Sequence, residues 1–387
     1  MIFKASLSKF QDTLQKALPA MPRKSTLPVL EHLSFTLEGN NLKIIATDQD
    51  IIILSNLEVE GLEDGKILVP GYKINEITKA LGSKGDIEFS TNEETFEIVL
   101  QTSFGKYKMK GLDEEEYLDI PVLFSTDKPN IDESNPPTAK FTADEINRLA
   151  EKTGFAVSID EFRPAMTGVL FEFKGDHVNA VATDSFRLVK AVNRSETNSY
   201  VEDISIIMPS RTIDLLKKID EDVTMSTIET QGKTTHARFD YGTTVLISRI
   251  IDEQFPAYET VIPDDNDLSA TIPQKELLAA IRRVSIFANT DSNQVKLSLQ
   301  ENVLQVLGED EESGTQAQET IECEFPGEQF SIGFNYRYLE QALQNTEDEM
   351  GDTGMVLMSF SEPNRPALIM PKENTDELLM LIMPVRI

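Results

Sequence analysis

The sequence is short of the residues that build disulfides and zinc sites. It has one cysteine, Cys323, so no disulfide can form within the chain and no cysteine-based zinc cluster can assemble. Its three histidines, His32, His177 and His236, lie far apart, each in or beside a strand-like stretch. A structural histidine fits that setting better than a metal ligand or a general base does. We therefore expect no metal, no cofactor and no catalytic centre.

Long apolar runs are also missing. No stretch of about 18 apolar residues exists, which excludes an ordinary membrane-spanning helix. The first residues turn polar by Lys4 and Ser6, too early for a secretory signal peptide. The chain is 40% apolar, enough for substantial cores, and its 387 residues predict two to three domains. Together these features predict a cytoplasmic protein with no membrane partner.

One four-part unit is repeated three times along the chain, with a period of about 130 residues that suits whole domains rather than a solenoid. Each copy has a helix, a strand pair, a strand that leads into a second helix, and a strand that ends in proline. The predicted first helices are Phe3 to Leu18, Phe141 to Thr153 and Ile272 to Val284. The predicted strand pairs are Leu33 to Leu37 with Leu42 to Asp48, Val169 to Phe173 with Val178 to Asp184, and Val295 to Leu299 with Val303 to Glu309. The strand-to-helix segments are Ile67 to Ile74, Ile206 to Ile213 and Phe330 to Arg337, and the last strands are Tyr117 to Pro121, Tyr258 to Pro263 and Leu381 to Pro384.

Two polar segments separate the repeats. Residues 124–137 are rich in Ser, Asp, Asn and Pro, and residues 263–267 are mostly acidic. We therefore expect three α+β domains, at 1–125, 137–263 and 268–387, each with two helices packed on antiparallel sheets. Ala-Thr-Asp recurs at equivalent places, ending in Asp48 and Asp184, and an aspartate there is better explained as a turn cap than as a metal ligand.

Positive charge is scarce overall but concentrated in the predicted helices. The chain has 36 basic and 66 acidic side chains, a net charge of −30, which argues against a protein that grips nucleic acid by affinity alone. The helix windows carry a net +7, which leaves −37 for the rest of the chain. These windows are residues 7–24, 71–84, 142–153, 209–220, 273–284 and 335–346.

Helical periodicity places those cations opposite the apolar faces. At about 100° per residue, Leu7, Phe10 and Leu14 form one stripe, and Lys9 and Lys16 lie opposite it. In any single helix this is an ordinary solvated face, but its recurrence in three repeats predicts a shared basic surface. The cations of later helices that follow the pattern are Lys217, Lys218, Lys275 and Arg282.

Five short motifs occur in an order and spacing that match one family. They are STLPVL at 25–30, ATDSFRL at 182–188, FPAY at 255–258, IGFN at 332–335 and MPVRI at 383–387. With them the chain resembles the bacterial DNA polymerase III beta subunit, the sliding clamp, over essentially its whole length. The resemblance implies a head-to-tail dimeric ring, with helices lining the hole and sheets outside. It also implies a processivity function, in which the ring encircles duplex DNA without sequence preference.

The resemblance further implies protein partners and a surface for them. The expected partners are the replicative DNA polymerase, the clamp loader and other proteins with a clamp-binding motif. Their peptides are expected in an apolar pocket between the second and third domains. By position, its residues are Met166, Thr183, Ser185, Phe186, Arg187, Leu188, Pro256, Thr260, Val261, Tyr338, Leu381, Met383, Pro384 and Val385. Phe186 stands where the family often has histidine, and Thr260 where some members have arginine, which leaves the peptide preference open.

The resemblance also implies contacts with DNA and contacts between the two chains of the dimer. The expected DNA contacts are Lys24, Tyr72, Lys73, Arg163 and Arg211. In the loop at 160–165 this chain departs from the polar and aromatic residues of some members, so Arg163 is the expected donor there. Head-to-tail closure is expected to join Tyr107 and Met109 to Ile286 and Phe287 of the second copy.

Two other classes of function remain as alternatives. One is an acidic repeat scaffold that recruits peptides without encircling DNA. The other is a hydrolase with paired carboxylates between domains, although 66 acidic residues make chance pairs expected. Topology-dependent retention on DNA would separate a clamp from both.

Overall fold

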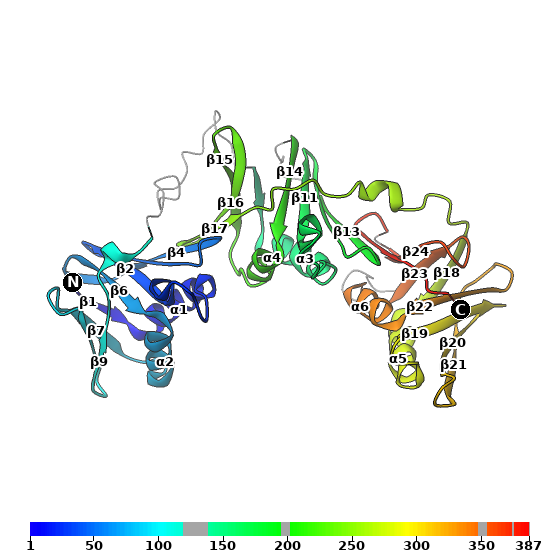
Figure 1. Ribbon diagram of the computed structural model, residues 1–387, viewed down its shortest axis with the longest axis horizontal. Coiled ribbons are helices and arrows are strands. Elements are labelled where there is room, and N and C mark those ends of the chain that lie inside the picture. The colour runs from blue at the N-terminus through cyan, green and yellow to red at the C-terminus, as the bar shows by residue number, and fades with distance from the viewer. Residues whose placement is uncertain (119–137, 195–201, 347–353, 374, 387) are drawn as a thin grey trace. The chain divides into compact units, whose positions relative to one another are not determined.

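The chain forms two compact units, each described here by itself. A computed structural model describes residues 1–118, 138–194, 202–346, 354–373 and 375–386 (Figure 1). Unit 1 contains Met1–Ala143 and Ile219–Ile250, and unit 2 contains Asp144–Lys218 and Ile251–Ile387. The central third of the chain therefore contributes strands to both units.

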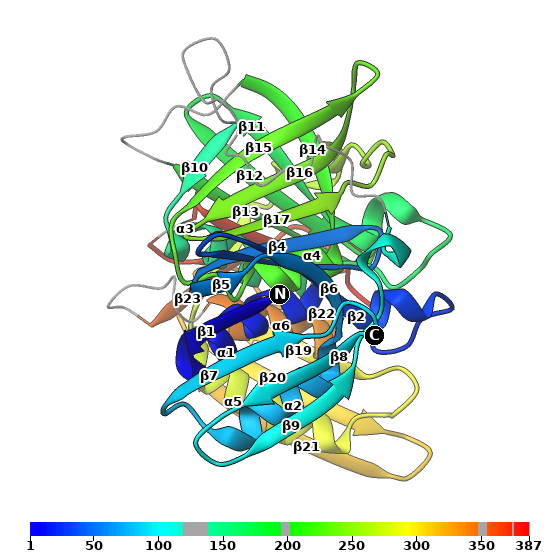
Figure 2. The ribbon, with the colours of Figure 1, turned by 90° about the vertical axis from the view of Figure 1, so that its left-hand side faces the viewer.

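The described part of unit 1 has two antiparallel sheets and two α-helices, α1 (Leu7–Ala17) and α2 (Gly71–Leu81). In the smaller sheet, prominent in Figure 2, the order is β5 (Glu60–Glu63), β1 (Ile2–Ser6), β7 (Asp86–Thr91), β8 (Glu97–Gln101), β9 (Lys106–Lys110). In the larger sheet the order is β10 (Ala139–Phe141), β15 (Val223–Thr230), β16 (Lys233–Tyr241), β17 (Thr244–Arg249), β4 (Ile51–Glu58), β3 (Asn41–Thr47), β2 (His32–Glu38), β6 (Gly65–Pro70).

A cluster of phenylalanines forms the centre of unit 1. Phe3 from β1 stacks on Phe89 from β7 with ring centroids 4.9 Å apart. Phe10 from α1 meets the ring of Phe35 from β2 edge-on at 6.0 Å. All four side chains are fully buried. The cluster thus joins α1 to both sheets, and aromatic pairs of this kind add to the stability gained from burial alone.

Unit 2 likewise has helices packed on a larger and a smaller antiparallel sheet. Its helices are α3 (Ala143–Gly154), α4 (Ser210–Leu216), α5 (Gln274–Val284) and α6 (Tyr336–Thr346), and α5 and α6 lie side by side (Figure 1). The larger sheet has the order β14 (Glu202–Pro209), β11 (Gly168–Lys174), β12 (His177–Thr183), β13 (Arg187–Arg194), β25 (Leu378–Ile382), β24 (Ala367–Pro371), β23 (Met355–Phe360), β18 (Leu268–Pro273). The smaller sheet has the order β21 (Thr315–Glu322), β20 (Val303–Asp310), β19 (Gln294–Gln300), β22 (Phe330–Asn335).

Each larger sheet runs without a break from one repeat into the next. In unit 1, β17 pairs with β4, so Ile247 of the second repeat faces Ile52 of the first. In unit 2, β13 pairs with β25, so Leu188 of the second repeat faces Leu381 of the third. Backbone hydrogen bonds therefore join the repeats and fix their register within each unit.

The predicted strand pairs and strand-to-helix segments are confirmed, but the starts of the first helices are wrong. Phe3, Phe141 and Ile272 lie in strands β1, β10 and β18, and the helices begin four, two and two residues later. Phe3 is held in β1 by pairing with Phe89 across the sheet, so tertiary packing overrides the helical periodicity there.

The predicted last strands of the repeats are confirmed only in part. Tyr258–Val261 is a 3-10 turn rather than a strand, because Tyr258 is drawn into the core of unit 2. Of the third, predicted as Leu381 to Pro384, the first two residues form the end of β25, and Met383 and Pro384 lie beyond the strand. Most of the first one, and the linker at 124–137, lie outside the described residues.

A substitution at Gly168 tests how closely β11 and β14 pack against each other. A Cβ at this position would lie 2.4 Å from the carbonyl oxygen of Met208. That oxygen belongs to a paired strand and cannot move aside, so we expect Gly168→Ala to destabilise unit 2 by about 1–3 kcal/mol. At Gly105 a Cβ meets no atom within 4 Å, so Gly105→Ala is the matched control. Thermal unfolding should show a lower Tm for the first variant only, and equal values would contradict the packing described here.

Candidate functional site

The turn between β12 and β13 positions the first part of the candidate peptide site. The Thr183 hydroxyl donates to the Arg187 carbonyl at 2.7 Å. The Asp184 carboxylate accepts from the backbone N–H groups of Phe186 and Arg187, both at 3.0 Å. Ser185 takes a positive φ of 78°. The turn leaves Phe186 facing solvent, and Asp184 acts as the predicted turn cap.

Arg187 fastens this turn to helix α6. Its side chain is nearly buried, and its Nε donates to Asp184 at 3.1 Å and its Nη2 to the Phe155 carbonyl at 2.8 Å. A third donor, Nη1, bonds the side-chain oxygen of Gln341. The guanidinium lies 4.8 Å from the ring centroid of Tyr338 and 5.2 Å from that of Phe155. Arg187 is therefore a support for the surface rather than a free cation on it.

Apolar side chains gather around this support. Phe186 stacks on Tyr338 with centroids 6.1 Å apart, and 56% of its surface is exposed. The backbone N–H of Met383 donates to the Phe186 carbonyl at 2.8 Å, which places the end of the chain beside the aromatic pair. The Ser185 hydroxyl lies 3.5 Å from the sulfur of Met166. The structure thus brings together residues from four distant stretches of sequence.

The remaining candidates in unit 2 lie beneath or beside this surface. Leu188 and Leu381 are buried in one core cluster with Tyr258, and Pro256 and Thr260 belong to the segment that Tyr258 anchors. The Tyr258 hydroxyl donates to the Glu172 carboxylate at 2.5 Å, and burial together with this carboxylate raises the pKa of Tyr258. The neighbouring Val261 is 53% exposed. After Pro384, the backbone N–H of Val385 donates to Gly333 at 2.9 Å.

In unit 1 the structure brings the three DNA candidates together. Tyr72 and Lys73 lie in the first turn of α2, and the Tyr72 hydroxyl donates to the Met21 carbonyl at 3.3 Å. That bond joins α2 to the loop that carries the exposed Lys24. Burial raises the pKa of Tyr72, so its hydroxyl stays a donor. Lys73 is exposed and lies 3.6 Å from Glu76.

In unit 2 the two DNA candidates differ in their surroundings. Arg211 is exposed in the first turn of α4. Arg163 donates from Nε to Asp160 at 2.8 Å and from Nη1 to the Ser185 hydroxyl at 2.7 Å. The hydrogen bond from Arg163 lowers the pKa of Asp160. Arg163 is thus bound to the peptide-site turn, which reduces what it can offer a phosphate.

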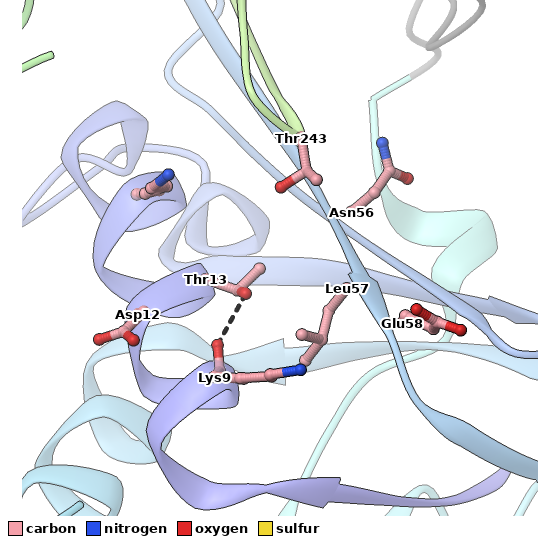
Figure 3. Close-up of a pocket in the computed structure, with 8 residues that line it drawn as sticks. Lys9, Asp12, Thr13, Asn56, Leu57, Glu58 and Thr243 are labelled. Atoms are coloured by element: carbon pink, nitrogen blue, oxygen red, sulfur yellow. Dashed lines mark hydrogen bonds between the residues drawn. The ribbon is translucent and has the colours of Figure 1, made fainter. Parts of the chain in front are cut away.

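A hollow of about 290 Å³ separates α1 from β4 in unit 1 (Figure 3). Two lysines, Lys9 and Lys16, line it together with two carboxylates, Asp12 and Glu58. Lys16 is further paired with Glu221 at 2.6 Å. With equal numbers of cations and carboxylates in its lining, the hollow is not selective for an anion.

The dimer candidates lie on a sheet edge in unit 1 and just after a helix in unit 2. Tyr107 and Met109 are half-buried on β9, which forms one edge of the smaller sheet of unit 1 (Figure 2). Ile286 and Phe287 follow α5 in a 3-10 turn of unit 2, with exposures of 78% and 40%. Exposed apolar side chains of this size on a helix end are typical of a covered interface.

Within the described residues, no three His, Cys, Asp or Glu side chains are placed to hold a metal ion. His177 bonds its neighbour Asp176 at 2.6 Å, and His32 lies 3.2 Å from the Pro28 carbonyl. Burial raises the pKa of the Cys323 thiol, which makes the reactive thiolate scarcer. No helix in the described part of the chain is long and apolar enough to cross a membrane.

Fold and candidate surfaces define a repeat protein of the DNA-clamp class. Three models of one family match in sequence: the N-terminal, central and C-terminal domains of the DNA polymerase III beta subunit, at residues 1–121, 140–257 and 259–386. The chain belongs to this family, and its expected fold of three clamp domains is confirmed.

Relatives and solved structures agree along the full chain. A beta sliding clamp from Caulobacter vibrioides is 28% identical over 371 residues, covering 94% of both chains. One from Staphylococcus epidermidis is 26% identical over 390 residues, covering 97% of both. The crystal structure of the DNA polymerase III subunit beta from Pseudomonas aeruginosa gives a TM-score of 0.86 at 25% identity, covering 100% of both chains. The prediction of a DNA sliding clamp is confirmed over the scaffold alternative.

Several supporting residues could not be found from the sequence. Phe155 and Gln341 hold Arg187, yet neither belongs to a recognisable motif. Their role depends on contacts across 32 and 154 residues of chain. Ile159 and Phe162 are almost fully exposed beside Arg163, and only the structure shows that they face solvent.

Asp184 offers a test of what its ion pair with Arg187 contributes. Its carboxylate accepts from two backbone N–H groups of the turn and also pairs with the nearly buried Arg187. Asn keeps an oxygen for the cap and removes the charge. We expect Asp184→Asn to cost roughly 1–3 kcal/mol of stability. The control is Asp113→Asn, at a cap that accepts from the Glu115 N–H at 3.1 Å, and it should change stability by less than about 0.5 kcal/mol. Chemical denaturation of both variants measures this, and equal losses would show that the Arg187 pair contributes nothing.

Proposed function

We propose that two copies of this chain close head to tail into a ring around duplex DNA in the cytoplasm. The ring tethers the replicative polymerase, the clamp loader and other motif-bearing proteins, and it performs no catalysis of its own. The observation that carries the proposal is a match to the clamp family along the whole of a chain with net charge −30. A net charge of −30 works against holding DNA by phosphate contacts alone, and in this proposal enclosure replaces affinity.

Enclosure requires contacts that are weak and insensitive to sequence. Phosphate contacts from lysine and arginine meet that need because they position DNA without reading bases. In this proposal Lys24, Lys73 and Arg211 serve as such contacts. Tyr72 adds a neutral side chain beside Lys73, and Arg163 contributes less because it also bonds Asp160 and Ser185. The acidic remainder of the surface keeps DNA away from other faces.

The charges of two sheet edges support head-to-tail closure. The edge strand β9 of unit 1 carries Lys106, Lys108 and Lys110. The edge strand β21 of unit 2 carries Glu319 and Glu322, and its hairpin with β20 is also acidic. An unpaired strand edge offers backbone donors and acceptors to another chain, and opposite charges select the right partner edge. Tyr107 and Met109, with Ile286 and Phe287 of the second copy, supply the apolar part of the contact.

The aromatic pair of Phe186 and Tyr338 supports a role in peptide capture. Phe186 is exposed and Tyr338 is half-buried, Met166 and Met383 lie beside them, and methionine adapts to varied ligands. Pro384 cannot continue the strand ladder of β25, and the N–H groups on either side of it are used, by Met383 toward Phe186 and by Val385 toward Gly333. The support for peptide capture therefore comes from the side chains. For the domains we keep boundaries at 1–125, 137–263 and 268–387. The family models support their number and order, although the third match begins at residue 259 rather than 268.

Retention on circular DNA tests the proposed function. Once loaded onto nicked circular DNA, the protein should stay bound through gel filtration and leave when the circle is linearised, because a ring slides off free ends. Short linear duplexes should bind weakly and lose affinity steeply with salt. A scaffold would show no dependence on DNA topology. Tight, salt-insensitive binding to a short linear duplex would refute enclosure as the mechanism.

The proposed dimer contact is tested at Ile286 and Phe287. Replacing both by aspartate should give monomers, because two charges would be buried against apolar side chains. Leu62→Asp is the control, since Leu62 is also exposed, at 55%, but lies on β5 rather than β9. Light scattering after gel filtration reports the native mass. If the double variant stays dimeric at the same concentration as the wild type, the assignment of this contact is wrong.

A further inference from the structure

Residues 251–267, named here the strap, lie against the larger sheet of unit 2 and lead from β17 to β18. At the start of the strap, the Ile251 backbone N–H donates to a carbonyl of β14 at 2.9 Å. Near its end, the Asn266 side chain donates to the Ser359 carbonyl at 3.1 Å. The structure describes every residue of the strap, and only Tyr258 among them is buried. One side chain therefore anchors the middle of the strap.

Tyr258 makes a polar bond inside an apolar cluster. Its neighbours in the cluster are aliphatic side chains from five strands of the larger sheet. Its hydroxyl nevertheless donates to the Glu172 carboxylate at 2.5 Å. Glu172 lies on β11, which is paired on both sides, with Asn179 of β12 and Ser205 of β14 facing this residue. The carboxylate is thus a fixed point of the sheet to which the strap is attached.

The bond fixes a position that apolar packing alone leaves open. Apolar contacts have no preferred direction, so the cluster by itself tolerates a shift of the strap along the sheet. A hydrogen bond to a charged acceptor is short and directional. The Glu172 side chain is 16% exposed, and its ion pair with Lys174 spans 3.9 Å. A shifted strap would leave this nearly buried carboxylate without its close donor, which is unfavourable.

The anchor also determines where three expected residues of the peptide site lie. The Tyr258 backbone N–H donates to the Pro256 carbonyl at 2.7 Å. The Thr260 hydroxyl donates to the Ala257 carbonyl at 2.7 Å, within the 3-10 turn region that ends at Val261. Val261 is 53% exposed. These bonds make the turn one local unit, so the side chains on its exposed face follow the position of Tyr258.

We propose that Tyr258 and Glu172 are positioning residues for partner binding. Neither touches the partner. Their bond holds the strap in place, so that Thr260 and Val261 meet a bound segment without first having to be ordered. This inference rests on the proposed function, because it assumes that partners bind around Phe186. It adds to that function a buried polar bond that sets the affinity of the surface from beneath.

The test measures the affinity of full-length variants for the replicative DNA polymerase of the same organism, together with their thermal unfolding. Tyr258→Phe keeps the ring and removes the donor. It should lower the Tm, because a nearly buried carboxylate loses its partner, and weaken binding about fivefold, because the strap has to be ordered on binding. Glu172→Gln keeps an acceptor oxygen and should bind within about twofold of wild type. Tyr241→Phe, at a buried tyrosine of unit 1, is the matched control with the same expected limit of about twofold.

A double variant separates positioning from stability. Tyr258→Phe/Glu172→Leu removes donor and acceptor together, so no unpaired carboxylate remains and the Tm should return toward that of wild type. Binding should stay about fivefold weaker, because the directional bond is still missing. A purely structural role makes the opposite prediction, in which affinity recovers together with Tm. That recovery would overturn the inference.

Phe186→Ser marks the partner surface itself, and native mass and retention on nicked circular DNA are measured for all variants. Weaker binding by Phe186→Ser, Tyr258→Phe and the double variant, with unchanged mass and retention, supports the inference. If only Phe186→Ser weakens binding, the inference is overturned and the proposed function stands. If Phe186→Ser binds normally, the partner surface is misplaced and both proposals fail. If Tyr258→Phe alters native mass or DNA retention, its bond acts beyond the partner surface, and the inference is again overturned.

Discussion

Backbone pairing between strands of different repeats determines where the candidate surfaces lie. In unit 2 the ladder between β13 and β25 sets Arg187 opposite Ile382, and the N–H of Met383 extends it to the Phe186 carbonyl. A shift of one residue would turn every side chain of β25 to the other face of the sheet. The register therefore decides that Met383, and not its neighbour, lies beside the aromatic pair.

Unit 1 contains the same turn with different chemistry. Gln49 takes a positive φ of 89° at the place of Ser185, and the Arg249 N–H donates to the Asp50 carbonyl at 2.8 Å, as Met383 does to Phe186. Here, however, the two side chains are charged, and Arg249 and Asp50 lie 3.7 Å apart. A surface whose charges are paired with each other gains little from an apolar ligand. The same turn thus presents an apolar surface in unit 2 and a polar surface in unit 1, because the side chains at the two bonded positions differ.

Local features of this structure were predictable from sequence, and long-range ones were not. The hairpins followed from alternating apolar residues around polar turns, and the Asp184 cap followed from its recurrence at Asp48. The start of α1 was not predictable, because Phe3 fits the apolar stripe of a helix as well as it fits a strand. Only its pairing with Phe89 across the sheet places it in β1. Similarly, Arg163 was expected to contact DNA. The residues around it in the sequence do not indicate its hydrogen bond to Ser185, which lies 22 residues away.

Many helix cations already face carboxylates within their own unit. Lys16 pairs with Glu221, Arg282 with Glu340 and Lys73 with Glu76. Exposed pairs of this kind add little to folding stability, since hydration and side-chain entropy offset the attraction. In the proposed ring their effect on DNA is larger, because a phosphate has to compete with a carboxylate that is already in place. Each protein–phosphate contact then replaces a similar contact within the protein, so it forms and breaks at small net cost. That exchange suits a ring that has to stay on DNA without holding it still.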